Sequence, residues 1–125
     1  MSVRILLCDD TPELRALMRS ALEARDDVTV VGEVGDGHRA LECAAQEQPD
    51  VVVLDLEMPG PVPEVLLAEL RRAAPGTAIV TFSGHDPAAV AGSAVDEIAL
   101  HVPKTTDLTA AARAVWEIGG NHYKS

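Results

Sequence analysis

The chain has 125 residues, which suits one compact domain and leaves little room for a second. Its composition is 47% hydrophobic but only 2% aromatic, so the core is expected to consist of Val, Leu, Ile and Ala, as in a buried parallel sheet. Twenty acidic and ten basic residues give a formal net charge of -10, which repels phosphate backbones and argues against direct nucleic-acid binding by this chain.

Short runs rich in Val, Leu and Ile alternate with amphipathic stretches along the chain. The expected strands cover residues 3–8, 28–31, 51–54, 78–82 and 99–102. Apolar residues at helical spacing follow each run, over residues 14–22, 40–44, 65–70, 88–95 and 108–115. This alternation predicts an α/β fold, a doubly wound (βα)5 domain with a five-stranded parallel sheet and right-handed crossovers.

Capping and helix-breaking residues agree with these boundaries. Gly119-Gly120 is predicted to end the last helix. The other signals are Thr11 and Pro12 before the first helix, Pro49-Asp50 after the second, Asp86-Pro87 before the fourth, and Thr106 or Asp107 before the fifth.

The cysteines and the N-terminal segment are typical of a cytoplasmic protein. Cys8 and Cys43 form neither a CxxC pair nor a zinc-type spacing, so two reduced, buried thiols are expected. The apolar run in MSVRILLCDD is too short for a signal peptide or a membrane span. We therefore expect a cytoplasmic domain without membrane contact.

Charged and polar residues follow four of the predicted strands, where doubly wound folds bind their ligands. They are Asp9 and Asp10 after the first strand, Asp55 after the third, Ser83 after the fourth and Lys104 after the fifth. Taken singly, the acid pair can cap a helix, the serine can belong to a turn and the lysine can be a solvated charge. As a set, three mutually repelling carboxylates predict a bound cation, and oxygen ligands favour Mg²⁺ over zinc.

These residues and their spacing resemble the receiver domains of bacterial response regulators over nearly the whole chain. Asp9-Asp10 is similar to the acidic pair of that family, and LDLEMPG around Asp55 is similar to its phosphoacceptor segment. Ser83, in IVTFSGH, falls at the switching Ser/Thr position, and Lys104 falls at the active-site lysine. The tail AVWEIGGNHYKS is similar to the receiver end of NarL/FixJ-type regulators. The resemblance implies the CheY-like strand order 2-1-3-4-5.

The resemblance also implies a phosphoryl-transfer chemistry. Asp55 would accept a phosphoryl group from the phosphohistidine of a sensor histidine kinase, with Lys104 and Ser83 binding phosphoryl oxygens. The chain would then be a signalling switch rather than an enzyme. The implied Mg²⁺ ligands are Asp10, Asp55 and the main-chain carbonyl of Glu57, with Asp9 acting mainly through water.

Four positions differ from the usual family pattern or modify it. His101 stands where an aromatic ring usually precedes the lysine by three residues, and it is either a core residue or a switch that reports rotamer or pH. Pro103 precedes Lys104 instead of following it, so the usual cis bond is not expected. Glu57 and His85 either tune the loss of the phosphoryl group to water or are solvated loop residues.

Phosphorylation is expected to switch the face formed by the fourth helix, the fifth strand and the fifth helix, and so control transcription through a helix-turn-helix effector. Residues 1–125 would form the receiver domain, with any effector outside this chain. Trp116 is expected on that face, as the anchor of a homodimer, or else folded over the edge of the sheet. The competing functions are a phosphorylation-independent docking module and a Mg²⁺-dependent phosphatase, whose acid motif would follow the first strand.

Overall fold

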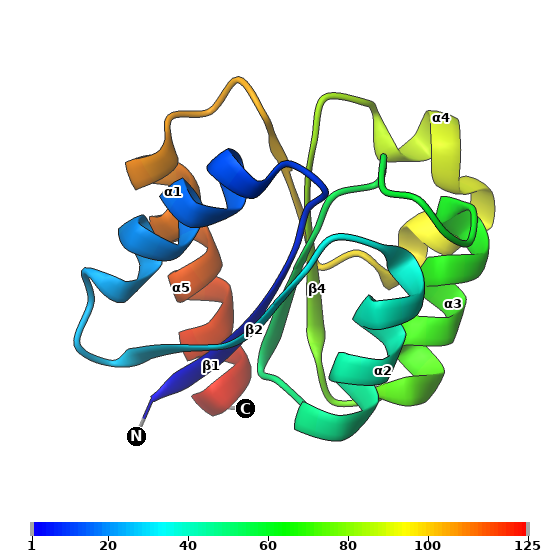
Figure 1. Cartoon of the computed structure of the whole chain (residues 1–125). Helices are drawn as coiled ribbons and strands as arrows, with labels where there is room; N and C mark the ends of the chain where they lie inside the picture. Colours follow the sequence, from blue (N-terminus) through cyan, green and yellow to red (C-terminus); the bar gives the residue numbers. More distant parts are fainter. Residues whose placement is uncertain (1, 125) are drawn as a thin grey trace.

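The computed structural model describes residues 2–124, and side chains as far as residue 120. A five-stranded parallel sheet of order β2-β1-β3-β4-β5 lies between two layers of helices (Figure 1). The strands are β1 (Val3–Cys8), β2 (Val28–Val34), β3 (Val51–Leu54), β4 (Ala78–Ser83) and β5 (Leu100–Pro103). The helices are α1 (Pro12–Glu23), α2 (Gly37–Glu47), α3 (Pro63–Ala73), α4 (Pro87–Ala91) and α5 (Leu108–Lys124), with the 3-10 helix η1 (Gly92–Glu97) after α4. The predicted doubly wound fold and its strand order are confirmed.

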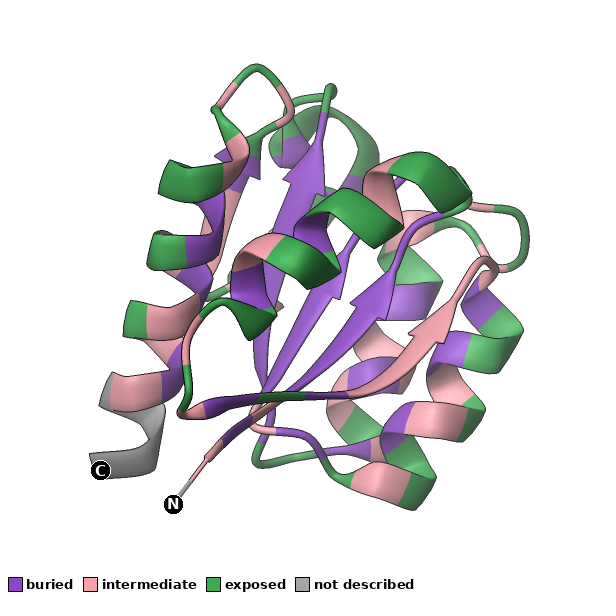
Figure 2. Ribbon diagram, turned by 60° about the vertical axis from the view of Figure 1, so that its left-hand side comes forward, coloured by how far each residue is buried: buried purple, intermediate pink, exposed green. Residues whose placement is uncertain are grey.

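Helices cover both faces of the sheet, with α1 and α5 on one side and α2, α3 and α4 on the other (Figure 1). The central strand β3, with the sequence VVVL, is buried along its whole length (Figure 2). Its alternating side chains place Val51 and Val53 in the core beneath α1 and α5, and Val52 and Leu54 in the core beneath α2 and α3. A strand fixed on both faces and both edges therefore carries Asp55 at its carboxyl end.

Aspartate side chains begin three of the helices. Asp36, Asp86 and Asp107 accept hydrogen bonds of 2.9 to 3.0 Å from main-chain N–H groups in the first turns of α2, α4 and α5. Of the two predicted starts of α5, the structure therefore selects the aspartate. Thr11 occupies the cap position of α1 as predicted, with Pro12 as the first helical residue, but its side chain makes no capping hydrogen bond.

The predicted fourth helix over residues 88–95 is divided into two short pieces. The helix α4 ends at Ala91, and η1 continues the chain from Gly92. Gly92 has a φ angle of 55°, in the left-handed region that side chains disfavour, so the α-helical turn stops there. The prediction of one continuous helix is wrong because it followed the apolar spacing and gave no weight to this glycine.

The prediction that Gly119-Gly120 ends the last helix is also wrong, because α5 continues to Lys124. Gly119 is buried where α5 crosses the start of β1 and β3. A β-carbon at this position would overlap the side chain of Val3 and lie 3.1 Å from Val51 Cγ2. Glycine here allows the helix to approach the sheet closely, rather than breaking the helix.

Replacing Gly119 with alanine is expected to destabilise the protein by about 1–3 kcal/mol, because the added methyl group overpacks the contact with Val3. This loss would exceed the gain of about 1 kcal/mol that alanine brings to a helix. Gly120→Ala is the matched control, since among the described residues no atom outside the helix's own backbone lies within 4 Å of a β-carbon there. Chemical denaturation would measure both, and equal stabilisation by the two changes would contradict the packing role.

The two cysteines are free thiols. Cys8 is buried, and burial raises the pKa of its thiol far above the usual range, so it stays protonated. Cys43 is only half-buried, so the prediction of two buried thiols is right for Cys8 alone. Across residues 2–124, no helix has both the length and the apolar character that crossing a membrane requires.

Candidate functional site

The predicted site residues meet at the carboxyl edge of the sheet. Asp9 and Asp10 follow β1, Asp55 follows β3, Ser83 ends β4 and Lys104 follows β5. These strands are parallel and adjacent in the order β1, β3, β4, β5, so their ends lie side by side. The main chain links the last two, since the N–H of Lys104 donates to the carbonyl of Ser83 at 3.1 Å.

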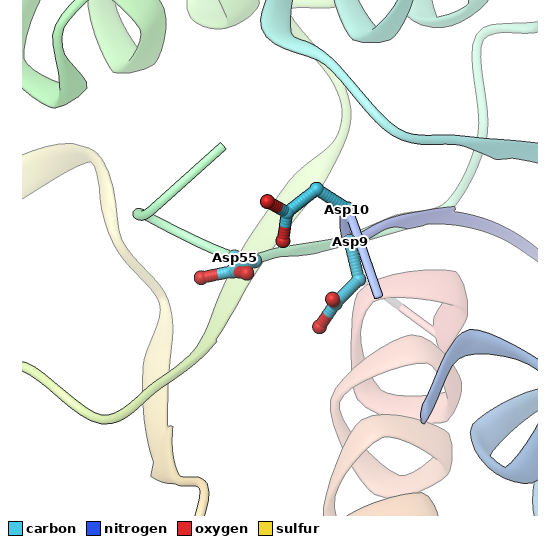
Figure 3. A group of neighbouring side chains, drawn as sticks. All are labelled: Asp9, Asp10 and Asp55. Carbon is cyan, nitrogen blue, oxygen red and sulfur yellow. The ribbon is translucent and has the colours of Figure 1, made fainter. Parts of the chain in front are cut away.

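The three aspartates form one cluster. Asp9, Asp10 and Asp55 each offer a carboxylate oxygen, and these oxygens all lie within 4.8 Å of one another (Figure 3). Asp55 is 2% exposed and Asp9 is 7% exposed, whereas Asp10 is open to solvent. The cluster therefore consists of two buried acids and a third, Asp10, on whose side it is open to solvent.

Lys104 joins the cluster from the end of β5. Its Nζ lies 3.1 Å from Asp55 Oδ2 and 3.3 Å from Asp9 Oδ2. Burial alone would lower the pKa of this lysine, but the hydrogen bond to Asp55 and the charges of both aspartates raise it above its ordinary value. The ammonium group is therefore charged at neutral pH and offsets part of the repulsion between the acids.

Opposing effects act on Asp55. Burial raises its pKa above the ordinary value, and the charge of Asp9 adds to this rise. The N–H of Glu57, which donates to Asp55 Oδ1 at 2.9 Å, and the ammonium of Lys104 act in the opposite direction. A nearby cation would favour the ionised form of this carboxyl group further.

The donor set of the cluster fits a hard divalent cation. Three carboxylates at this spacing supply only oxygen ligands, and the exposure of Asp10 leaves one side open to water. Mg²⁺ prefers oxygen ligands and usually keeps several of its waters, whereas zinc would favour His or Cys. Glu57 is predicted to be a further ligand through its carbonyl. It lies beside the cluster, and its N–H donates to Asp55.

The two predicted tuning residues contact each other beside the site. His85 Nε2 lies 3.3 Å from Glu57 Oε2, and both side chains are about half exposed. Ser83, which is 1% exposed, accepts a hydrogen bond of 3.2 Å from the N–H of His85. The loops after β3 and β4 are thereby joined above Ser83. These residues are solvated, and they are also paired across the site.

His101 is half-buried and hydrogen-bonded. Its Nδ1 lies 2.7 Å from Thr81 Oγ1, and the two residues are partners in the register of β4 and β5. Thr81 is fully buried and points to the same face of β4 as Ser83, two residues further on. Sequence analysis missed Thr81, although the alternation along the predicted strand pairs it with Ser83.

Arg15 is a second residue that sequence analysis missed. It lies in the second turn of α1, and its Nη1 donates to the carbonyl of Asp9 at 2.6 Å. Helical side chains lean toward the N-terminus of their helix, which brings this guanidinium group back to the acid pair. Arg15 lies one turn after the capping residue Thr11, and this position could have indicated that its side chain reaches the acid pair.

Trp116 lies elsewhere than predicted. The apolar stripe of α5 is confirmed, with Ala111, Ala112 and Val115 buried. The Trp116 indole, however, donates from Nε1 to Asp27 Oδ2 at 2.8 Å, and the guanidinium carbon of Arg25 lies 4.2 Å from the ring centroid. Both partners belong to the segment between α1 and β2. The expectation that this ring lies on the α4–β5–α5 face is therefore wrong.

Comparisons with known proteins agree with this geometry. Residues 5–114 match the family described as the response regulator receiver domain. YxjL of Bacillus subtilis, an uncharacterized transcriptional regulatory protein, is 37% identical over 84 residues, which cover 67% of this chain and 38% of YxjL. The nitrate/nitrite response regulator NarL of Escherichia coli is 40% identical over 79 residues, which cover 63% of this chain and 37% of NarL. The matched part spans less than two fifths of these curated relatives.

Solved receiver structures are similar over almost the whole chain. The signal receiver domain of NarL from Mycobacterium tuberculosis has a TM-score of 0.83 and 33% identity, covering 95% of this chain and 97% of that one. A LuxR-family two-component response regulator from Aurantimonas has a TM-score of 0.84 and 30% identity, covering 97% of this chain and 87% of that one. With the family match over residues 5–114, these similarities show that the chain belongs to the response regulator receiver domain family and is of the NarL type.

Proposed function

We propose that Asp55 accepts a phosphoryl group from the phosphohistidine of a sensor histidine kinase. The observation that supports this proposal most strongly is the place of Asp55 in the cluster. Its carboxylate directly follows the buried central strand, lies close to two other acids and contacts the ammonium of Lys104. A nucleophile in this position is held rigidly, and the groups that would compensate a phosphoryl charge are already beside it.

The proposed reaction is a displacement at phosphorus. An oxygen of Asp55 attacks the phosphorus atom, and the bond from phosphorus to the kinase imidazole breaks, leaving its electron pair on the nitrogen. The ammonium of Lys104 is placed to bind an oxygen of the transferred group. A bound Mg²⁺ would neutralise charge on the phosphoryl oxygens. Its proposed ligands are Asp10, Asp55 and the carbonyl of Glu57, with Asp9 acting through water.

The proposed switch uses the residues beside the new phosphoryl group. The hydroxyl of Ser83 would turn toward a phosphoryl oxygen. It would thereby give up the hydrogen bond that it accepts from the N–H of His85. His101 would respond through Thr81, which shares a face of β4 with Ser83. Glu57 and His85 contact each other, and their main-chain N–H groups donate to Asp55 and Ser83, which supports a role in the lifetime of the phosphoryl group.

The wider role is proposed from the family. The α4–β5–α5 face would transmit the signal to a DNA-binding effector outside residues 1–125, as the NarL and LuxR relatives suggest. The receiver would work in the cytoplasm as a signalling switch, without turnover of another substrate. A homodimer through the same face stays a proposal, to which Trp116 no longer contributes. A phosphorylation-independent docking module is less well supported, because the acids and the lysine of the site are complete and in contact.

Mapping of the phosphoryl group tests this function directly. The full chain would be incubated with phosphoramidate and Mg²⁺, reduced with borohydride and analysed by mass spectrometry. The label is expected on Asp55 alone, and EDTA should slow labelling at least about a hundredfold, since such an ion stabilises the transition state by several kcal/mol. Labelling at another residue would overturn the assignment of Asp55. Labelling that proceeds equally well in EDTA would overturn the metal site.

A further inference from the structure

Arg15 binds the main chain of the acid pair. Its Nη1 donates to the carbonyl of Asp9 at 2.6 Å, and its Nε lies 3.4 Å from Glu33 Oε1 on β2. The side chain is 21% exposed, so the guanidinium group is largely enclosed between α1 and the end of β2. It also packs against the loop after β2, where a β-carbon at Gly35 would lie 3.3 Å from Nη1. The contact is therefore built from two strands and a helix, and is not a chance pairing on the surface.

The carbonyl of Asp9 belongs to the peptide group that joins Asp9 to Asp10. Rotation of this peptide group changes the direction in which the Asp10 side chain leaves the main chain. The other polar groups of Asp9 are already bound, since its N–H donates to Val34 at 3.0 Å and its Oδ1 accepts from the N–H of Thr11 at 2.9 Å. Arg15 supplies the contact that holds the carbonyl side of this peptide.

The orientation of the Asp10 side chain depends on this peptide group more than that of the Asp9 side chain does. Asp9 is buried and contacts Lys104 through its carboxylate, whereas Asp10 is exposed. An exposed acid with free rotation would spend less time aimed at the site, and ordering it would cost conformational entropy when the ion binds. Fixing the main chain at Asp10 reduces that cost.

We propose that Arg15 is a positioning residue for Mg²⁺ binding, which orients Asp10 by holding the Asp9 carbonyl while its guanidinium group is paired with Glu33. The inference rests on the proposed function of the acid cluster. Arg15 does not contact the ion or the phosphoryl group. It acts through the peptide group between the two acids.

Arg19 provides a matched control in the same helix. It lies one turn after Arg15 and pairs with Glu33, and also with Glu23 of its own helix, but it makes no contact with Asp9 among the described residues. Arg15→Met and Arg19→Met therefore remove the same charge from the same partner, and only the first removes the hydrogen bond to the Asp9 carbonyl. A difference between them reports on the acid pair rather than on Glu33.

The test is a titration of the full chain with Mg²⁺ alone, followed by the amide signals of Thr11 and Glu57 in ¹H–¹⁵N NMR spectra. Arg15→Met is expected to weaken Mg²⁺ binding about tenfold, with Arg19→Met close to wild type. Arg15→Lys should fall between them, because a lysine can reach the carbonyl or Glu33 but not both. The lysine variant also serves if the methionine variant does not fold.

Three results separate the possibilities. Equal weakening by Arg15→Met and Arg19→Met would overturn the inference, because the loss would then come from Glu33. Unchanged affinity in both arginine variants would overturn it as well. A wild-type chain that shows no Mg²⁺-dependent shifts at Thr11 or Glu57 would instead contradict the proposed function of the cluster.

Discussion

Replacing Asp55 with asparagine is expected to abolish phosphorylation and, at neutral pH, to stabilise the protein. The amide cannot attack phosphorus as an anion, so labelling should fall at least about a thousandfold. The gain in stability has another cause. Burial raises the pKa of Asp55, so the ionised carboxylate is unfavourable in the folded protein, and the neutral amide removes that penalty. Lys104 keeps Asp9 as a partner, 3.3 Å away.

The sign of the stability change depends on pH. A carboxyl group whose folded pKa is raised stabilises the protein below its ordinary pKa of 3.8, and this contribution is lost as pH rises through the folded value. Wild type and Asp55→Asn should therefore differ at pH 7, and the difference should shrink toward pH 3. Asp96→Asn, at an exposed acid of η1, is the control for both labelling and denaturation midpoints. Wild-type labelling of Asp55→Asn, or a loss of stability at pH 7, would contradict this prediction.

The main part of the site could be predicted because it depends on local signals. Asp9, Asp10, Asp55 and Lys104 each follow a short apolar run, and parallel strands place all of their carboxyl ends at one edge. Neither the strand register nor the helix lengths needed to be known for these residues to meet. The acid cluster and its lysine therefore follow from the sequence.

The predictions that failed depended on distant neighbours. Gly119 looks like a helix stop because glycine is unfavourable inside a helix, but its closeness to Val3, at the other end of the chain, decides the outcome. A helical wheel places Trp116 outside the apolar stripe of α5. It does not show that Asp27 lies close enough to accept a hydrogen bond from the indole. Such choices are made by tertiary contacts, and a local pattern carries no information about them.

The missed residues have partners that are distant in the sequence. Thr81 contacts His101 across two strands, and Arg15 reaches Glu33 on the edge strand. Each looks ordinary in isolation, a threonine inside a strand and an arginine on an amphipathic helix. Their roles depend on register and helix packing, which fix the side-chain pairs only after the fold has formed.

Replacing Lys104 with methionine is expected to slow phosphorylation of Asp55 about a hundredfold to a thousandfold, as the loss of one positioned donor to a developing charge usually does. It should also destabilise the protein by about 1–3 kcal/mol at pH 7, because the buried carboxylate of Asp55 loses a charged hydrogen-bond partner. The stability effect is therefore opposite to that of Asp55→Asn. Arg113→Met, which breaks an exposed pair with Glu117, is the control for loss of a cation and should change stability by no more than about 0.5 kcal/mol.

The pH dependence and a double variant identify the cause. Lys104 lowers the pKa of Asp55, so its removal raises that pKa further, and the variant loses stability over the range in which Asp55 ionises. The deficit of Lys104→Met should be small near pH 3, where Asp55 is protonated, and should grow toward pH 7. In an Asp55→Asn background the same change should cost much less, because only the pairing with Asp9 remains to be lost. Equal costs in both backgrounds, measured by urea denaturation, would show that Lys104 stabilises the fold independently of the phosphoacceptor.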